Sequence, residues 1–545
     1  MGNPADCLRS QLNYEPRELA FGTSGRRAPI THLTQLEVYI NVLAEVRYLQ
    51  SLNPSEGGTQ TGDEFYLAYD LRPSSTEYVP GQAGCGEIFQ ASARAACDAG
   101  MHPVSLGALP TPALMHYAAG NRKGSLMVTG SHIPFDRNGY KLNTSRGELL
   151  KHQEDPINRA VHQLRQEIYG QPFADSIFNR SGGFRDGHRE LPPVNPSGRI
   201  AYLQRYTDFF DGESLAGKRI LVYQHSAVGR DLLVELLRSF RAEVIPAGRC
   251  EQFVPIDTEN IDAEQMQVIQ DLATTAEAQY GPLDAVVSTD GDSDRPLILG
   301  VERGEAQFFG GDLAGMIVAE YLEADSVVVP ISCNDAIDRG PLAGITEPKT
   351  RIGSPYVIAG MQAAAQRGRR QICGWEANGG FLTGSDFERR GKMLSALPTR
   401  DAFLPILAVL FSSAESKLSL SALFAQLPPR FSRAALLKNF PSSVSRRIVS
   451  AFTPNGAGGM EQIRKRLQAF FSPDAGFTPI LSIDCTDGLR ITFTGGDVAH
   501  FRPSGNADEF RCYAVAGTQA RADAIARIAT AEPDGIMRRM ERSVQ

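Results

Sequence analysis

The stretch MVTGSHIPFDRNGYKL (127–142) sets the pattern on which the fold of this chain is built, because a short apolar run ends abruptly in a polar loop. Gly130, Pro134 and Gly139 interrupt the stretch too often for a helix or a central strand to continue through it. Loops on the ends of rigid strands commonly carry reactive side chains. We therefore expect Ser131 to lie at or near a functional site.

The same arrangement of a β-prone run followed by a polar loop recurs along the chain. The predicted strands are Phe65–Tyr69, Leu126–Val128, Ile220–Tyr223, Ala285–Ser288 and Val327–Pro330. Helix-patterned stretches such as Leu232–Phe240 and Leu313–Leu322 lie between them, and this alternation predicts parallel sheets covered by helices. In such sheets ligands bind outside the carboxyl ends of the strands, where these loops would lie.

Length and composition narrow the class of protein. A chain of 545 residues corresponds to three or four domains at about 150 residues each. With a net charge of −7 and no apolar run of about 18 residues, nothing favours a nucleic-acid partner or a membrane. The eight cysteines form no CxxC pair, which argues against a zinc site or a disulfide framework. The start resembles no signal peptide, so we expect a cytoplasmic protein.

The segment TDGDSDRP (289–296) places three carboxylates at alternate positions after a predicted strand: Asp290, Asp292 and Asp294. Carboxylates this close repel one another unless a cation joins them, and oxygen ligands favour Mg²⁺ or Ca²⁺ over zinc. An EF-hand is excluded, because its glycine position holds Arg295. Arg295 beside an acidic metal site instead suits an anionic ligand that binds both the metal and the guanidinium. The alternative is a solvated acidic turn.

Ser131 has two interpretations when its loop is considered alone. A hydroxyl that closes or caps a turn is the commoner role of serine in loops. A serine-hydrolase elbow is not supported, because G-x-S-x-G is absent around Ser131. Adjacent residues rarely point at each other, so we expect His132 to be a structural or anion-contacting residue rather than a base.

The segment FRPSGNADEFRCY (501–513) gathers guanidinium, hydroxyl and backbone N–H donors in one loop, which suits a phosphate. The candidate residues are Arg502, Ser504, Gly505, Asn506 and Arg511. An exposed hairpin with basic residues is the alternative.

The segment GWEANGGF (374–381) contains the only tryptophan of the chain. We expect Glu376 and Asn378 to lie on the same side of an extended segment, because strand side chains alternate. A carboxylate beside an amide suits neighbouring sugar hydroxyls. A plain turn is the alternative.

In order, these segments resemble the signature loops of the α-D-phosphohexomutases, which include phosphomannomutases and phosphoglucomutases. The similar segments are FGTSGRR (21–27) for the amino-terminal motif, TGSHIPFDRNGYK for the phosphoserine loop, DGDSDR for the metal loop, WEANGG for the sugar loop and RPSGNADEFR for the phosphate loop. AYDLRPSS (68–75) and LGALPTP (106–112) also resemble family segments. The resemblance runs from about residue 20 into the last domain.

The resemblance implies an α/β protein with four domains around a central cleft. The first three would be α/β domains with mixed or parallel sheets, and the last a smaller α+β domain. The expected ranges are 1–180 with the phosphoserine loop, 195–303 with the metal loop, 304–425 with the sugar loop and 440–545 with the phosphate loop.

The resemblance also implies that Ser131 carries a phosphoryl group, which it exchanges with a hexose phosphate through a hexose 1,6-bisphosphate intermediate and activator. A phosphoserine adds nearly two negative charges, so we expect Mg²⁺ between Ser131 and the three aspartates. Arg27, His132 and Arg295 would lie beside the transferring group, and Lys141 would handle the proton. The loop at 502–511 would anchor the other phosphate, while Glu376 and Asn378 would hold O3 and O4 of the sugar.

Three departures from the family pattern affect the sugar: Ile133 replaces Asn, Asn378 replaces Ser and Gly380 replaces His. LPTRDAFLP (397–405) resembles the phosphomannomutase members more closely. The expected reaction is therefore the interconversion of mannose 6-phosphate and mannose 1-phosphate by a monomer or homodimer. A phosphoglucomutase or an enzyme of dual specificity is the alternative within the family. The alternative of another class is a catalytically silent sugar-phosphate-binding protein.

Overall fold

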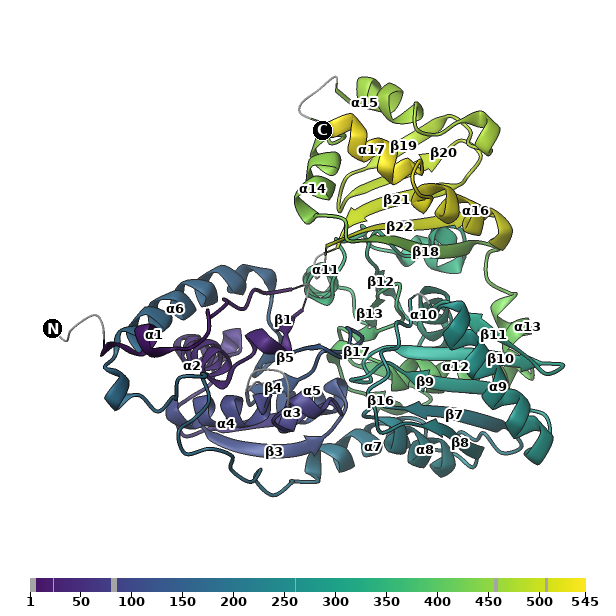
Figure 1. The fold of residues 1–545 in the computed structure, drawn as a ribbon. Coiled ribbons are helices and arrows are strands. Elements are labelled where there is room, and N and C mark those ends of the chain that lie inside the picture. The colour runs from purple at the N-terminus through teal and green to yellow at the C-terminus, as the bar shows by residue number, and fades with distance from the viewer. Residues whose placement is uncertain (1–5, 23, 80–85, 260, 455–458, 505–507) are drawn as a thin grey trace.

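The protein has an α/β fold built on mixed sheets, as expected from the sequence (Figure 1). The structure is a computed structural model that describes residues 6–22, 24–79, 86–259, 261–454, 459–504 and 508–545. In Figure 1 the first sheet, purple and blue, lies beside the teal and green second and third sheets. The fourth sheet, yellow-green, stands over the others.

The first sheet has the order β1-β5-β4-β2-β3, with β6 beside β5. Its strands are β1 (Arg26–Pro29), β2 (Glu64–Tyr69), β3 (His102–Ala108), β4 (Ser125–Val128), β5 (Arg137–Thr144) and β6 (Gly147–Glu148). Its helices are α2 (Gln35–Ser51), α4 (Ile88–Asp98), α5 (Thr111–Gly120) and α6 (Lys151–Gly170). In β2, Phe65 packs in one apolar core and Tyr66 in another, so both faces of the sheet are covered.

One expectation for the opening stretch is wrong, because β5 passes through Gly139 and lies between β1 and β4. A Cβ atom on Gly139 would lie 1.9 Å from the carbonyl oxygen of Arg26. Glycine therefore allows close approach of the neighbouring strand. That approach places Arg27 directly opposite Gly139.

The second and third sheets also combine parallel and antiparallel pairs. The second contains β7 (Arg219–His225), β8 (Glu243–Arg249), β9 (Ala285–Thr289), β10 (Pro296–Glu302) and β11 (Glu305–Phe309), with helices α8 (Arg230–Ser239) and α9 (Ala263–Tyr280). The third contains β12 (Ser326–Val328), β13 (Ile372–Trp375), β14 (Phe381–Thr383) and β17 (Leu397–Asp401), with helices α10 (Gly311–Tyr321), α11 (Ser354–Gln366) and α12 (Phe403–Ser416). Helix α7 (Ser197–Phe209) packs against α5 of the first sheet and α8 of the second, and β15 (Phe387–Arg389) pairs with β16 (Lys392–Leu394).

The fourth sheet is entirely antiparallel. Its strands are β18 (Phe431–Lys438), β19 (Ile480–Asp484), β20 (Leu489–Phe493), β21 (Val498–Pro503) and β22 (Glu509–Ala516), and its helices are α14 (Ser442–Ala451), α15 (Gly459–Gln468), α16 (Gln519–Thr530) and α17 (Ile536–Val544). Polar contacts join this sheet to the third. Arg430 donates to Asp335 Oδ1 at 2.7 Å and to the Gly496 carbonyl at 2.7 Å.

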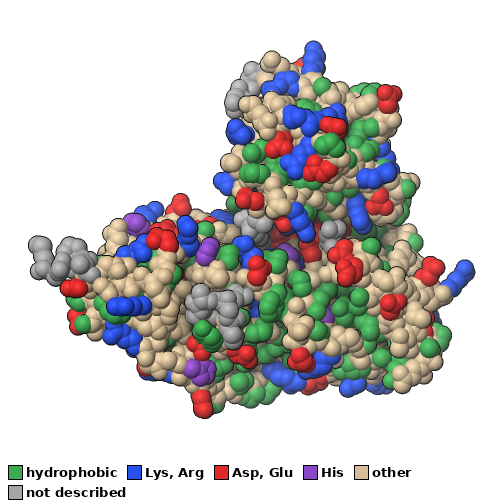
Figure 2. All heavy atoms as spheres, viewed as in Figure 1, with side chains coloured by type: hydrophobic (Ala, Val, Ile, Leu, Met, Phe, Trp, Pro, Cys, Tyr) green, Lys and Arg blue, Asp and Glu red, His purple; other side chains and the backbone are tan. Residues whose placement is uncertain are grey.

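The second and fourth sheets extend beyond the predicted domain ranges. Strand β11 pairs with β10 although the boundary was predicted after residue 303, and β18 pairs with β22 although the last domain was predicted to begin at 440. The predicted division into four domains otherwise stays a prediction. Among the residues that the structure describes, no helix is both long and apolar enough to cross a membrane. The face in Figure 2 carries acidic and basic side chains interspersed.

The core of the third sheet provides a test of this packing. Trp375 is 1% exposed and stacks on Phe381 with ring centroids 5.7 Å apart. A Cβ atom on Gly315 in α10 would lie 2.4 Å from the indole ring. The helix can therefore pack this closely only with glycine at position 315.

We predict that Gly315→Ala destabilises this part of the protein by about 1–3 kcal/mol, because an added methyl group overpacks the core. Urea unfolding followed by tryptophan fluorescence measures the effect, since Trp375 is the only tryptophan in the chain. Gly344→Ala is the control, because a Cβ atom there meets nothing within 4 Å. Equal midpoints for the two variants would contradict the packing described here.

Candidate functional site

Ser131 lies in the loop that follows β4, and Asp70, which follows the neighbouring β2, holds that loop. Asp70 Oδ2 accepts hydrogen bonds from Thr129 Oγ1 at 2.7 Å and from the Gly130 amide at 3.2 Å. Ser131 has a φ of 53°, a left-handed conformation that is unfavourable for any residue with a Cβ atom. The surrounding contacts must therefore hold the serine in place.

Arg72 supplies most of those contacts. Its guanidinium group donates to four backbone carbonyl groups of the loop, those of Ser131, Ile133, Pro134 and Arg137. A Cβ atom on Gly130 would lie 2.7 Å from the guanidinium carbon, so only glycine leaves room for this arginine. The Phe253 ring also packs against this guanidinium, with its centroid 3.7 Å from the guanidinium carbon.

The three aspartates follow β9 and meet the Ser131 loop. Asp290, Asp292 and Asp294 are buried, and one carboxylate oxygen from each lies within 4.8 Å of the others. Ser131 Oγ donates to Asp290 Oδ2 at 2.8 Å. The structure thus brings together the serine and the aspartates that the sequence placed in one site.

Residues from three other elements bind the aspartates. Lys141 Nζ from β5 donates to Oδ2 of Asp292 and of Asp294, both at 2.7 Å. Thr111 Oγ1, at the start of α5, donates to Asp292 Oδ2 at 2.6 Å. Arg400 from β17 donates to Asp294 Oδ2 through Nε at 3.1 Å and Nη2 at 2.8 Å.

The remaining oxygens fit a magnesium ion. Asp292 Oδ1 and Asp294 Oδ1 are buried, and no described residue donates a hydrogen bond to either. Buried polar atoms almost always have partners, so two such oxygens in one cluster indicate a place where a cation fits. An all-oxygen set of carboxylates and a serine oxygen favours Mg²⁺ over zinc.

The electrostatics of the cluster are uneven. Burial, followed by the charges of Asp292 and Asp294, holds the pKa of Asp290 well above its usual range. Burial also opposes ionisation of Asp294, but Arg400, Lys141 and Arg295 outweigh it and hold that pKa well below the usual range. Two of the carboxylates are thus neutralised by fixed cations, while Asp290 has the least compensation.

Two arginines, Arg295 and Arg27, add positive charge beside the aspartates. Arg295 Nε lies 3.6 Å from Asp294 Oδ1, and Arg295 Nη1 donates to His132 Nδ1 at 3.0 Å. Burial together with Arg295, Arg27 and Arg511 holds the pKa of His132 well below its usual range. Burial and the neighbouring Arg295 and Arg400 lower the pKa of Arg27 to about 10, so Arg27 stays charged at neutral pH.

His132 points toward its neighbour more than adjacent residues usually do, because its Nδ1 lies 3.4 Å from Ser131 Oγ. A guanidinium can only donate, so Nδ1 is an acceptor that Arg295 already occupies. The serine hydroxyl hydrogen is directed to Asp290 instead. His132 is therefore not placed as a base for Ser131, and it lies against the Arg295 guanidinium instead.

The sugar loop is a turn and not the extended segment that we expected. The Gly379 amide donates to the Glu376 carbonyl at 2.9 Å, and Asn378 Oδ1 accepts from the Gly380 amide at 3.0 Å. Glu376 Oε2 accepts from Arg400 Nη1 at 2.9 Å. The turn still places the Glu376 carboxylate close to the metal loop, because Arg400 donates both to Glu376 and to Asp294.

The phosphate loop reaches the site from the fourth sheet. Arg502 donates to Asp487 at 3.1 Å, and Arg511 donates to Glu509 at 3.0 Å and lies 4.0 Å from Glu259. The Ser504 amide donates to the Glu509 carbonyl at 3.0 Å. The predicted ligands Gly505 and Asn506 lie outside the described residues.

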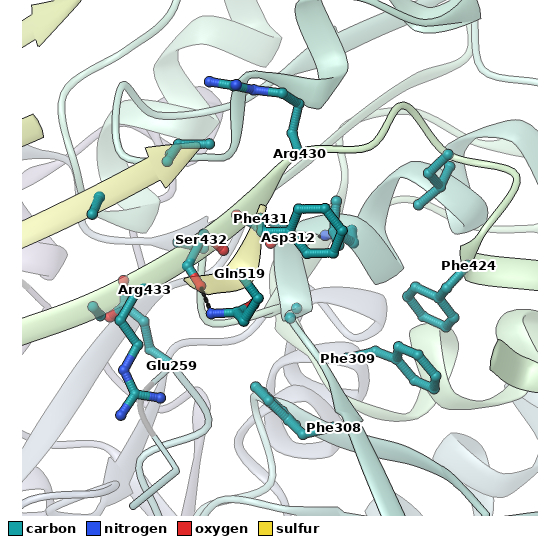
Figure 3. A pocket seen from close by; sticks show the side chains of 18 of the residues that line it. Glu259, Phe308, Phe309, Asp312, Phe424, Arg430, Phe431, Ser432, Arg433 and Gln519 are labelled. Atoms are coloured by element: carbon teal, nitrogen blue, oxygen red, sulfur yellow. Dashed lines mark hydrogen bonds between the residues drawn. The ribbon is translucent and has the colours of Figure 1, made fainter. Parts of the chain in front are cut away.

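A cavity of 640 Å³ opens beside this site, between the fourth sheet and the rest of the protein (Figure 3). Phe309 and Phe424 stack on one side with centroids 4.0 Å apart, and Glu259 and Arg433 lie on the other. Burial and Asp257 raise the pKa of Glu259 to about 7. The lining does not include Ser131 or the three aspartates, so the cavity adjoins the predicted site and does not contain it.

Sequence reasoning missed four residues that complete the site: Arg72, Thr111, Glu259 and Arg400. Thr111 and Arg72 lie within the segments LGALPTP and AYDLRPSS, and Arg400 within LPTRDAFLP, but no role followed from those segments alone. The only available signal was their position after predicted strands or in segments that resemble the family.

Comparison with known proteins identifies two regions of the chain. Residues 18–167 match the family described as phosphoglucomutase/phosphomannomutase, alpha/beta/alpha domain I, and residues 310–431 match domain III of the same family. A phosphomannomutase from Sinorhizobium fredii (strain NBRC 101917 / NGR234) is 37% identical over 91% of this chain and 94% of its own length. A phosphomannomutase from Salmonella muenchen is 37% identical over 92% of each chain.

The fold is also shared with a solved structure. The crystal structure of a phosphoglucomutase/phosphomannomutase family protein from Burkholderia thailandensis superposes with a TM-score of 0.62 at 19% identity, over 96% of this chain and 97% of that one. The similarity in fold therefore extends across all four sheets.

We predict that Arg72→Met loosens the Ser131 loop, because four carbonyl groups lose a charged donor, each worth about 1.5–3 kcal/mol at most. Hydrogen exchange of the amides of residues 129–137 should quicken by about tenfold or more, which corresponds to 1.4 kcal/mol. Arg94→Met, which removes a partly exposed ion pair on α4, is the control. Unchanged exchange in Arg72→Met would show that Arg72 does not hold the loop.

Proposed function

The chain belongs to the α-D-phosphohexomutase family, and on that premise we propose that it interconverts mannose 6-phosphate and mannose 1-phosphate. The enzyme is an isomerase that acts by phosphoryl transfer. The observation that carries the proposal is the hydrogen bond from Ser131 Oγ to Asp290 Oδ2, in a cluster where two further carboxylate oxygens accept no hydrogen bond from the described residues.

In the proposed reaction, Ser131 begins as a phosphoserine. The bond between Oγ and phosphorus breaks, a bond forms between phosphorus and the O1 oxygen of mannose 6-phosphate, and the O1 proton ends on Ser131 Oγ. The product of this half-reaction is mannose 1,6-bisphosphate. In the second half-reaction the bond between O6 and phosphorus breaks, a bond forms between phosphorus and Ser131 Oγ, the Oγ proton ends on O6, and mannose 1-phosphate is released.

Phosphoryl transfer depends mainly on positioning and on neutralising charge. Asp290, Asp292, Asp294 and a Ser131 oxygen would hold Mg²⁺, which would neutralise negative charge on the transferring group. Arg295 and Arg27 extend positive charge above the aspartates. The fixed cations already balance much of the carboxylate charge, so the charge of a phosphoserine dianion would be offset by Mg²⁺ together with Arg295 and Arg27.

Lys141 is the proposed proton carrier. Its ammonium group has three N–H bonds, and Asp292 and Asp294 accept two of them. One N–H therefore remains to protonate the oxygen that leaves phosphorus. Asp290 Oδ2 orients the free Ser131 hydroxyl when that hydroxyl accepts the phosphoryl group again.

The fourth sheet would anchor the phosphate that does not react. Arg502, Ser504 and Arg511 come from β21, β22 and their connecting loop, which also contains Gly505 and Asn506. An anchor that recognises only a phosphate accepts the bisphosphate in either orientation. Glu376 and Asn378 would hold the sugar hydroxyls between the anchor and Ser131, although Asn378 Oδ1 also closes its own turn.

We predict that Ser131→Ala lowers kcat by about 10⁴-fold or more, since losing a nucleophile removes the covalent route. A coupled mutase assay with mannose 1-phosphate, Mg²⁺ and a hexose 1,6-bisphosphate measures this loss. Ser145→Ala is the control, because that buried serine donates to Gly58 outside the site. Full activity in Ser131→Ala would refute the mechanism. Tight binding of mannose 6-phosphate by a wild-type protein without turnover would instead indicate a silent binding protein.

We further predict a higher kcat/KM for mannose 1-phosphate than for glucose 1-phosphate under the same conditions. The prediction rests on the identity to two phosphomannomutases over most of the chain. Comparable values would establish dual specificity, and a preference for glucose 1-phosphate would overturn the proposed substrate while leaving the phosphoryl-transfer mechanism intact.

A further inference from the structure

Arg400 occupies a position between the two halves of the site. Its side chain is 3% exposed, and its guanidinium binds the metal-loop residue Asp294 and the sugar-loop residue Glu376 at the same time. The distances are 2.8 Å from Nη2 to Asp294 Oδ2 and 2.9 Å from Nη1 to Glu376 Oε2. All three side chains are buried, so this pair of contacts is little screened by solvent.

The chain leaves room for this arginine at Gly380. A Cβ atom on Gly380 would lie 2.5 Å from Cδ, 2.8 Å from Cγ and 2.9 Å from Cβ of Arg400. Any other residue at 380 would displace the stem of the arginine. The glycine in the sugar loop and the arginine in β17 therefore form one packing unit, which explains why position 380 carries no side chain.

Further contacts fix the direction of the guanidinium. Nη1 also donates to Ser354 Oγ, at the start of α11, at 3.3 Å. Ser354 Oγ in turn donates to Glu148 Oε2 in β6 at 2.6 Å, and Thr399 Oγ1 donates to Glu148 Oε1 at 2.6 Å. Arg400 is thus held by residues from the first and third sheets before any ligand arrives.

The geometry decides which carboxylate oxygens are left for ligands. Arg400 and Lys141 together occupy Asp294 Oδ2, whereas no described residue donates a hydrogen bond to Asp294 Oδ1, which lies 3.6 Å from Arg295 Nε. Arg400 likewise occupies Glu376 Oε2, so Oε1 is the oxygen that can accept a sugar hydroxyl. A planar guanidinium can hold two carboxylates in fixed directions, whereas an ammonium is a point charge with no such fork.

We infer that Arg400 is a positioning residue that orients the metal-binding carboxylate of Asp294 and the sugar-binding carboxylate of Glu376 through one guanidinium. The assignment of the two carboxylates to metal and sugar rests on the proposed function. Arg400 contacts neither ligand itself and acts through the carboxylates that it holds. Removing it therefore weakens two separate binding events, at two ends of the site, by one substitution.

The test measures each binding event without the other ligand, by isothermal titration calorimetry. Mg²⁺ alone is titrated into the metal-free protein, and mannose 6-phosphate is titrated in the presence of EDTA. Arg400→Gln should raise both dissociation constants by about tenfold or more, the usual effect of losing a residue that orients a metal ligand. Arg400→Lys keeps the charge but loses the fork, so it should restore at most one of the two affinities.

Arg205→Gln is the matched control, because Arg205 is a buried arginine that donates to Ser395 in a different part of the protein. It should leave both dissociation constants unchanged. Trp375 fluorescence verifies that each variant is folded, and the charge-conserving Arg400→Lys keeps the test valid if Arg400→Gln does not fold.

An Arg400→Gln protein with either dissociation constant unchanged, or an Arg400→Lys protein with both fully restored, would overturn the inference. These outcomes are distinct from failure of the proposed function, which would appear as a wild-type protein without mutase activity. The binding measurements do not depend on turnover and remain decisive in that case.

Discussion

The mutual repulsion of Asp290, Asp292 and Asp294 is the constraint on which the rest of the site depends. Two unit charges 4 Å apart repel by about 4 kcal/mol at an effective dielectric constant of 20, and burial increases the cost of each charge. The chain offsets this repulsion with Lys141 from the first sheet, Arg400 from the third and Arg295 beside the cluster. The cluster is therefore compensated only when three parts of the chain are assembled around it. Asp292 Oδ1 and Asp294 Oδ1, which accept no hydrogen bond from the described part of the chain, are the oxygens that this compensation leaves for a divalent cation.

A second requirement is that backbone and side chains approach one another unusually closely around the cluster. Gly139 lets β1 approach β5, Gly130 makes room for the Arg72 guanidinium, and Gly380 makes room for the stem of Arg400. In each case the glycine is needed because of a specific neighbour from another part of the chain. Close contacts also hold the Ser131 loop, where Asp70 and Arg72 together keep a serine in a left-handed conformation. The precision of the site thus depends on residues that never contact a substrate.

The sequence allowed the loops to be predicted better than the contacts between them. Ser131, the three aspartates and Lys141 lie in short motifs whose residue types reveal their chemistry, and the structure brings them together. Arg400 could not be predicted from spacing, because it is 106 positions from Asp294 and its role exists only after folding. Where contacts with distant parts of the chain decide the local structure, expectations from neighbouring residues were not met. Gly139 lies inside a strand, and Glu376 lies in a turn. His132 approaches Ser131, and Arg295 holds it there.

The measurement that tests the central claim most directly is the fate of a labelled phosphoryl group in a single turnover. The protein is labelled with a hexose 1,6-bisphosphate carrying ³²P, freed of excess label, and mixed with mannose 6-phosphate and Mg²⁺ in a rapid-quench instrument. The account predicts that the label is on Ser131 at the start and passes to the sugar at least as fast as steady-state turnover. Label on another residue, or label that stays on Ser131 while unlabelled product accumulates, would contradict it.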